Sequence, residues 1–161
     1  MTKMQHLKDT VIHKKIILEI GEKVVDWLVQ NGRNEEAIDL AKRLIIHDNS
    51  KISEEEMGNF LSIESHENMV NPNVLMDENI KAAVAAHWKN NRHHPEHFSD
   101  YHNMNEVDII EMVCDWYSRS LQNKTDFLNF VETRQKNRFK FDEDFYNKVK
   151  EYCLTIIEIN K

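Results

Sequence analysis

Apolar residues recur every three or four positions along most of this chain, the spacing that places them on one face of an α-helix. The first such pattern predicts one long helix over about residues 2–30, which the Asn31-Gly32 pair ends because these residues tolerate a positive φ. A second pattern predicts a helix whose buried face leads directly to His47 and Asp48. The two apolar faces consist of Leu7, Val11, Ile17, Ile20, Val24 and Leu28, and then of Ala37, Leu40, Ala41 and Leu44.

The remainder of the chain also has helical spacing, interrupted by polar connections. Ser53 before three glutamates resembles a helix start, and Asp77 is expected to cap a helix whose apolar face ends at His87. A further helix begins at Asn105 and carries acids among its inward positions. The predicted helices lie near 57–63, from 77 to about 87, from 105 onward and near 125–135 and 143–159, with irregular connections at 65–76 and 90–102.

The composition supports this helical interpretation. Three Gly and two Pro among 161 residues argue against a turn-rich β-sandwich and for long helices. No segment alternates between apolar and polar residues with a period of two. The predicted fold class is therefore all-α, an orthogonal helical bundle, and the length fits a single domain over residues 1–161.

Charge and cysteine content narrow the function. The net charge is −7, from 21 basic and 28 acidic residues, which disfavours general nucleic-acid binding but permits a small anionic substrate in a locally positive, metal-loaded pocket. Cys114 and Cys153 make no disulfide framework and are expected to be buried free thiols. No apolar stretch approaches the ~20 residues that span a bilayer, and no signal sequence is recognisable, so we expect a cytoplasmic protein. The sequence does not indicate an oligomeric state.

The dipeptide His47-Asp48 places an imidazole and a carboxylate side by side at the end of an apolar run. Both side chains can reach one divalent cation if the helix ends or tightens there. Alone the pair is a weak indication, because a chain with nine His and many acids contains one fairly often. It gains weight from other candidate ligands on separate helices and in the second polar connection: His13, His87, His93, His94, His97 and Asp115.

Each candidate ligand also has an ordinary structural interpretation. A single His on an apolar helix face is usually a hydrogen-bonded core residue, and a helix acid such as Asp115 is more often exposed. His93, His94 and His97 lie in a polar stretch where solvated surface is the default. Buried carboxylates, however, are costly unless they are paired or bound to a metal. Imidazoles and acids converging from several helices therefore favour a metal centre over a salt-bridge cluster.

The order of these residues resembles that of the HD superfamily of helical, metal-dependent phosphohydrolases. His47-Asp48-Asn49-Ser50-Lys51 is similar to the His-Asp-x-x-Lys motif of its cyclic-dinucleotide phosphodiesterases. The chain departs from that branch because His87 lies closer to the His93-His94 pair and no glycine-rich segment follows the pair. It is more closely similar to an uncharacterised family of small bacterial and phage HD-like proteins, over about residues 5–120. The matching segments are His13-Lys14, Ile46–Lys51, His87–His97 and Glu111–Trp116.

The resemblance implies an HD-type bundle with a metal-site core at about 5–120 and C-terminal helices at about 121–160. It implies two metal positions that share Asp48. The first set of ligands would be His13, His47, Asp48 and Asp115, and the second Asp48, His87 and either His93 or His94. Imidazole and carboxylate ligands suit Mn, Fe, Zn, Co or Ni better than Mg or Ca, so we expect one or two transition-metal ions.

Other polar residues near these motifs are candidates for contact with a substrate. Lys51, one turn past Asp48, is expected to act as a proton donor or phosphate clamp. Arg92 and Arg119 are expected to face the substrate, because an arginine fork matches two phosphate oxygens. Asn91 is a candidate for substrate contact or, like Glu111, for orienting the imidazoles.

The leading hypothesis is a hydrolase of a small phosphoester, with a nucleotide or a related phosphorylated metabolite as the expected substrate. Water between two cations becomes hydroxide near neutral pH and would attack phosphorus in line, with Asp48 and Lys51 as catalytic residues. One alternative is an HD-fold di-iron oxygenase, which metal content and a need for O₂ would distinguish. Another is a non-catalytic, metal-dependent nucleotide binder, which would need fewer of these groups. Substrate specificity is expected from residues 65–76, the loop after His94 and the C-terminal helices.

Overall fold

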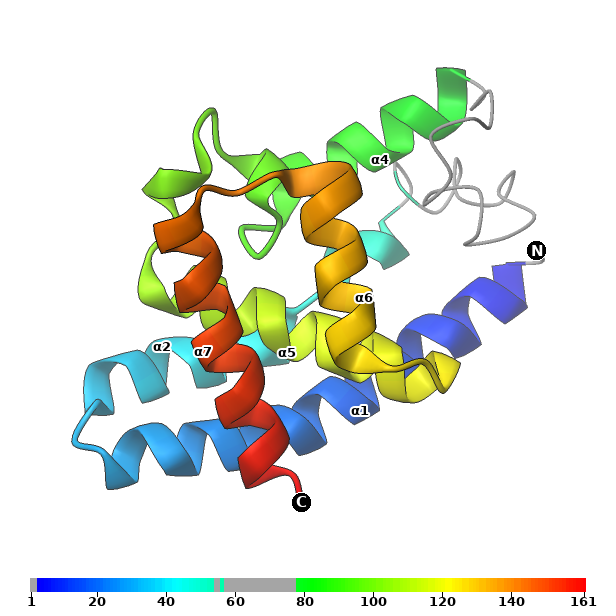
Figure 1. Ribbon diagram of the computed structural model, residues 1–161. Helices are drawn as coiled ribbons and strands as arrows, with labels where there is room; N and C mark the ends of the chain where they lie inside the picture. Colours follow the sequence, from blue (N-terminus) through cyan, green and yellow to red (C-terminus); the bar gives the residue numbers. More distant parts are fainter. Residues whose placement is uncertain (1–2, 54–55, 57–77) are drawn as a thin grey trace.

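The computed structural model describes residues 3–53, 56 and 78–161, and the regular elements in these ranges are all helical. The long α1 and the shorter α2 lie side by side, and α6 and α7 cross the direction of α1 (Figure 1). Short 3₁₀-helices cover Asn49–Ile52, Pro95–His97 and Tyr101–Asn103. The α-helices are α1 (Lys3–Gln30), α2 (Asn34–Ile46), α4 (Glu78–Asn90), α5 (Glu106–Asn123), α6 (Phe127–Arg134) and α7 (Glu143–Ile159).

The two N-terminal helices form a tightly packed hairpin. Gly32 adopts a φ of +75°, and the N–H of Arg33 then donates to the carbonyl of Leu28 at 2.9 Å, which closes the end of α1. Halfway along α1, a Cβ on Gly21 would lie 2.2 Å from Cδ1 of Leu44. The glycine that weakens the helix locally therefore lets α1 and α2 approach closely.

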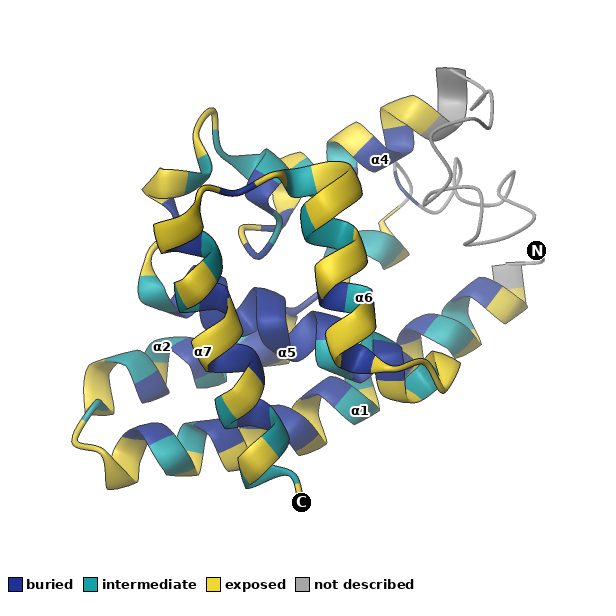
Figure 2. Cartoon of the chain, in the orientation of Figure 1, coloured by how far each residue is buried: buried dark blue, intermediate teal, exposed yellow. Residues whose placement is uncertain are grey.

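The central helix is α5, which contacts α1, α2, α6 and α7. Figure 2 shows most of its length in the colour of buried residues. A reciprocal cap begins it: the side chain of Asn105 accepts from the N–H of Asp108, and the Asp108 carboxylate accepts from the N–H of Asn105. Its buried face carries Glu111 and Asp115 as well as apolar residues. The core helix thus brings ionisable groups inside.

The structure confirms the all-α class, since no strand occurs in the described ranges. The helix near 125–135 continues past Arg134 as a π-helix, Gln135–Phe139, and the connection at 90–102 contains 3₁₀ turns. Cys114 and Cys153 are buried free thiols, as predicted. The predicted helix at 57–63, the connection at 65–76 and the cap at Asp77 lie outside the described residues. Among the described helices none is long and apolar enough to cross a membrane.

The N-terminal half of α1 differs from the prediction. The apolar spacing placed Val11 on the buried face, but this residue is 64% exposed. The buried positions are instead His6, Thr10 and His13. Apolar spacing fails here because this half of the helix faces a polar centre, so polar side chains occupy its inward positions.

Candidate metal centre

His47 and Asp48 lie where α2 ends. The last helical residue is Ile46, and Asp48 adopts the left-handed conformation (φ 56°, ψ 17°), which Asp tolerates better than most other residues. This break directs two adjacent side chains into one interior space, whereas a continuing helix would separate them by about 100°. Nζ of Lys14, on α1, donates to the carbonyl of His47 at 3.1 Å and so holds the turn. The helix end that the dipeptide required is present.

Four side chains from two helices and this turn form the first donor set: His13, His47, Asp48 and Asp115. Nε2 of His13 lies 2.9 Å from Oδ1 of Asp115 and 3.4 Å from Nε2 of His47. Oδ2 of Asp48 lies 3.6 Å from the first imidazole and 3.7 Å from the second. Ligands about 2.0–2.2 Å from one ion lie about 3.0–3.5 Å from each other. The observed separations therefore have the size that a single ion requires.

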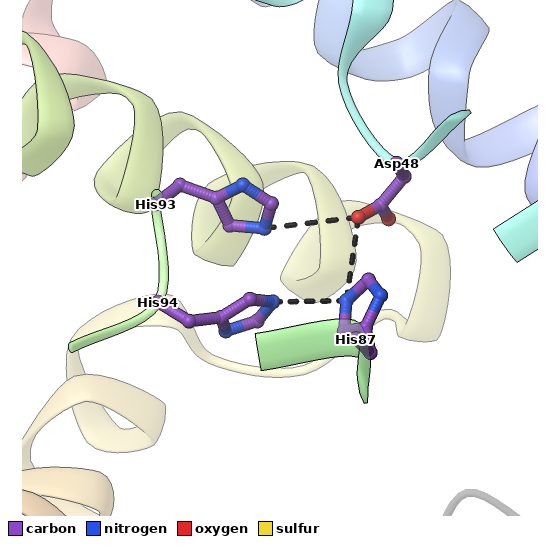
Figure 3. Close-up of side chains that lie close together, drawn as sticks. All are labelled: Asp48, His87, His93 and His94. Carbon is purple, nitrogen blue, oxygen red and sulfur yellow. Dashed lines mark hydrogen bonds and ion pairs between the residues drawn. The ribbon is translucent and has the colours of Figure 1, made fainter. Parts of the chain in front are cut away.

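The second donor set consists of Asp48, His87, His93 and His94, whose side chains converge in Figure 3. Oδ1 of Asp48 lies 3.4 Å from Nε2 of His87 and 3.7 Å from Nε2 of His93. Nε2 of His94 lies 2.9 Å from Nε2 of His87. The structure thus brings both histidines of the adjacent pair to the set, where the sequence left a choice between them.

Asp48 is the residue that joins the two sets. Its Oδ2 faces the first set and its Oδ1 faces the second, which is how a bridging carboxylate is arranged. Oδ1 of Asp48 and Nε2 of His93 are both buried without a hydrogen-bond partner, and they face each other. Buried polar atoms of this kind are rare in folded proteins unless an ion or a water satisfies them. These two atoms therefore fit a metal at the second set.

In four of the donor histidines, Nδ1, the ring nitrogen that does not face the proposed metal, has a partner that orients the ring. Nδ1 of His47 lies 2.9 Å and Nδ1 of His93 3.4 Å from the same oxygen of Glu111. Nδ1 of His87 lies 2.9 Å from Glu56. Nδ1 of His13 lies 3.1 Å from Oγ of Ser118, which itself donates to the carbonyl of Asp115. An acceptor at Nδ1 places the ring proton there and leaves the Nε2 lone pair for a metal.

Glu111 could also serve as a ligand itself, because its oxygens lie close to His47 and His93. That arrangement would use the Nδ1 atoms of both rings and would turn their Nε2 atoms away from metal binding. It provides three ligands, whereas the two Nε2-based sets provide four each. We therefore assign Glu111 to orienting one imidazole of each set.

Charge makes the metal-free centre receptive to cations. Burial lowers the pKa of His13 to about 4. Burial also acts on His47, but the carboxylates of Asp48, Asp115 and Glu111 outweigh it and raise its pKa to about 9. Against the effect of burial, Lys51 and the surrounding imidazoles hold the pKa of Asp48 well below its usual range. The carboxylates are therefore ionised at neutral pH, and at least one imidazole carries a proton that a metal would replace.

Comparison with known proteins assigns the sequence to a family. A family match covers residues 2–157, nearly the whole chain. The chain belongs to DUF5662, a family of unknown function. No curated protein and no solved structure matches it. The function of this DUF5662 protein therefore rests on the chemistry of its own site.

Two cationic side chains lie beside the Asp48 carboxylate. Nζ of Lys51 forms an ion pair with Oδ2 of Asp48, and Nη2 of Arg119 lies 3.9 Å from the same oxygen. The side chain of Asp48 is 1% exposed, whereas those of Asp115, Lys51 and Arg119 are 11%, 13% and 18% exposed. The centre thus meets solvent on the side where the cations lie.

The other predicted substrate residues occupy different positions. Arg92 forms a two-pronged pair with the buried carboxylate of Asp108, at 2.9 and 3.0 Å. Asn91 donates to Oγ of Ser50 and to the carbonyl of His87, so it helps hold the second set. Both line a pocket of about 290 Å³ next to the centre. His97 lies outside the donor sets, and its Nδ1 faces a backbone carbonyl.

The sequence analysis assigned no role at the site to three residues that contribute to it, although Lys14 lies in a segment that matches the HD-like family. Lys14 holds the turn at His47, Glu56 holds His87, and Ser118 holds His13. Ser118 lies one turn after Asp115 on the buried face of α5, and this spacing could have identified it. Glu56 was noted only as part of a helix-capping pattern, which the N–H of Glu56 satisfies by donating to Oγ of Ser53 at 3.3 Å.

Proposed function

We propose that this protein is a metal-dependent phosphohydrolase of the HD type, with two divalent transition-metal ions that Asp48 bridges. The observation that carries the proposal is the division of the Asp48 carboxylate, with one oxygen toward each histidine-containing set. Imidazoles mixed with carboxylates suit Mn, Fe, Zn, Co or Ni, whereas Mg and Ca prefer oxygen ligands.

Two such ions, when bound, supply Lewis acidity to a phosphoryl oxygen and acidify water. The chain's own residues provide the rest. Glu56, Glu111 and Ser118 keep the imidazoles in the required ring orientation. Lys51 and Arg119 lie on the solvent side of Asp48, where they can bind phosphoryl oxygens, and Lys51 can donate a proton to the leaving oxygen.

The same two cations favour a phosphoester over an uncharged substrate. Without an anion, Lys51 and Arg119 are attracted to the metal ligand itself. Two metal ions would reduce that attraction and make Lys51 available to a phosphate, with Arg119, which Asp9 also holds, as a second cation beside it. We therefore favour a small phosphoester, with a nucleotide or a related metabolite as the expected class, over the substrates of a di-iron oxygenase.

Metal analysis tests the first part of the proposal. Asp48→Asn should remove both ions from protein reconstituted with Mn²⁺, because the amide cannot bridge two cations. Asp26→Asn, an exposed acid on α1, is the matched control and should retain about two ions per chain. An unchanged metal content in Asp48→Asn would contradict the assignment.

Phosphate release from a panel of phosphomonoesters and phosphodiesters, including nucleotides, tests the reaction. Activity should be equal with and without O₂. Lys51→Ala should reduce turnover ~10²–10⁴-fold, the usual effect of losing a positioned acid or cation. Its metal content should stay unchanged, because the substitution removes a cation from the ligand Asp48. Bound iron together with O₂ consumption and no phosphatase activity would support the oxygenase instead.

A further inference from the structure

Arg134, the last residue of α6, differs from the other arginines of the chain. All six arginines lie in the described ranges, and every one except Arg134 forms an ion pair with a carboxylate there. The side chain of Arg134 has no hydrogen bond or ion pair in the part of the chain that the structure describes, and its guanidinium lies over the ring of Phe130 at 4.9 Å. The paired ones are Arg33 with Glu36, Arg43 with Asp39 and Asp108, Arg92 with Asp108, Arg119 with Asp9, and Arg138 with Glu96.

The position of Arg134 is costly for an unpaired cation. The residue is partly buried, and burial lowers the pKa of Arg134 to about 10, with a further decrease from the charge of Arg138. The carboxylates of Asp115 and Glu96 oppose this decrease, although neither contacts the guanidinium. A partly desolvated guanidinium without a carboxylate offers donors that an added anion would pair with.

The surrounding structure holds the end of α6, which carries Arg134, in a fixed position. Immediately after it the chain becomes a π-helix, an irregularity that is frequent at functional sites. Gln135 clamps the turn, because its side chain donates to the carbonyl of Phe141 at 2.7 Å and accepts from the N–H of the same residue at 3.0 Å. The guanidinium of Arg134 lies over the ring of Phe130. The centre of that ring is 6.3 Å from the ring centre of Trp116, the residue next to Asp115 in the sequence. A rigid element thus presents the cation.

A second contact ties the π-helix to the other donor set. Arg138 pairs with Glu96, in the loop that follows His94, and its guanidinium lies 5.1 Å from the ring centre of Trp88, the neighbour of His87. Figure 1 shows this end of α6 near the loop after α4. The end of α6 and the π-helix after it thus contact the neighbour of Asp115 and the loop that follows His94, and the charges of Asp115 and Glu96 both act on the Arg134 guanidinium.

We propose that Arg134 is a specificity-determining residue that binds a second anionic group of the substrate, a phosphate or a carboxylate. This inference rests on the proposed function, because the first phosphoryl group would occupy the metal ions with Lys51 and Arg119. The preferred substrates are then phosphoesters with an additional negative charge. An ester with a single phosphate and no other charge would leave the Arg134 fork unsatisfied.

The test measures, by calorimetry, the binding of phosphonates to the Mn²⁺-loaded protein. Phosphonates have no phosphate ester bond that the protein could hydrolyse. The probes are ethyl-, propyl- and butylphosphonate, the phosphonocarboxylates of the same chain lengths, and the corresponding bisphosphonates. The carboxylate and bisphosphonate series distinguish the two sources of the second charge. At the best chain length we expect the doubly charged probe to bind at least about tenfold more tightly than the alkylphosphonate, the usual value of a charged hydrogen bond.

Arg134→Gln should abolish this preference and leave alkylphosphonate affinity within about threefold, while Arg134→Lys should retain part of it. Lys136→Gln, two residues further along the π-helix and exposed, removes the same charge and should preserve the preference. Mn²⁺ stoichiometry and thermal midpoint identify a variant that has lost its structure. If Arg134→Gln still preferred the doubly charged probes, or if the wild type showed no such preference at any chain length, the role of Arg134 would be overturned and the proposed hydrolase would not. Failure of every phosphonate to bind would overturn both it and the proposed hydrolase.

Discussion

Glu111 provides the sharpest test of the two-ion geometry, because one of its oxygens contacts an imidazole of each donor set. It lies 2.9 Å from Nδ1 of His47 and 3.4 Å from Nδ1 of His93. Losing the hydrogen-bond partner of a metal-binding imidazole typically reduces metal affinity about 10–100-fold, or about 1.4–2.8 kcal/mol per ion. Glu111→Ala should therefore weaken both ions by this amount. Glu111→Gln should have a smaller effect, since the amide oxygen still accepts from both rings.

A comparison with Glu56 shows whether these acids act by orienting individual imidazoles or only through their negative charge. Glu56 contacts only His87 among the donor residues, so Glu56→Gln should weaken the second ion and leave the first unchanged. Glu132→Gln, an exposed acid on α6, should change neither. Calorimetric titration of the metal-free variants with Mn²⁺ measures both affinities. Loss of one ion with unchanged affinity for the other in Glu111→Gln would mean that Glu111 is a ligand of a single ion, and the reasoning would be wrong.

Three further outcomes follow from the structure. His87→Ala should keep about one ion per chain and lose most turnover, whereas His97→Ala should be milder; equal loss in both would move His97 into the centre. Because the pKa of His47 is raised to about 9, metal binding at pH 7.5 should release about one proton from His47, and metal affinity should rise with pH up to about 9. Calorimetry in buffers of different ionisation enthalpy measures the released protons. Metal binding without proton release would contradict this prediction. Gly21→Ala should destabilise the fold by about 1–3 kcal/mol, because its methyl group overlaps the Leu44 side chain; an unchanged denaturation midpoint would show that this side chain moves freely.

The sequence predicted most of the helices, and the HD resemblance implied the grouping of His13, His47, Asp48 and Asp115 that the structure brings together. Apolar spacing identified α5 and its inward residues, and Glu111 and Asp115 are buried as expected. The same reasoning misplaced Val11, because it assumes that inward positions are apolar. That assumption fails where a helix faces a polar centre. The HD resemblance supplied the order of the ligands but could not show which atoms face one another.

The tertiary structure decided how the site is assembled. Residue types and order identify His13, His47, Asp48 and Asp115 as candidate ligands, because as a set they converge from separate segments and buried carboxylates are costly without a partner or a metal. Only the packed helices show that Asp48 divides its oxygens between two sets, since this depends on a left-handed turn that the dipeptide alone does not specify. The unpaired state of Arg134 is equally invisible in the sequence. Whether a cation has a partner depends on which distant residues the fold brings within a few ångströms, and local spacing carries no record of that.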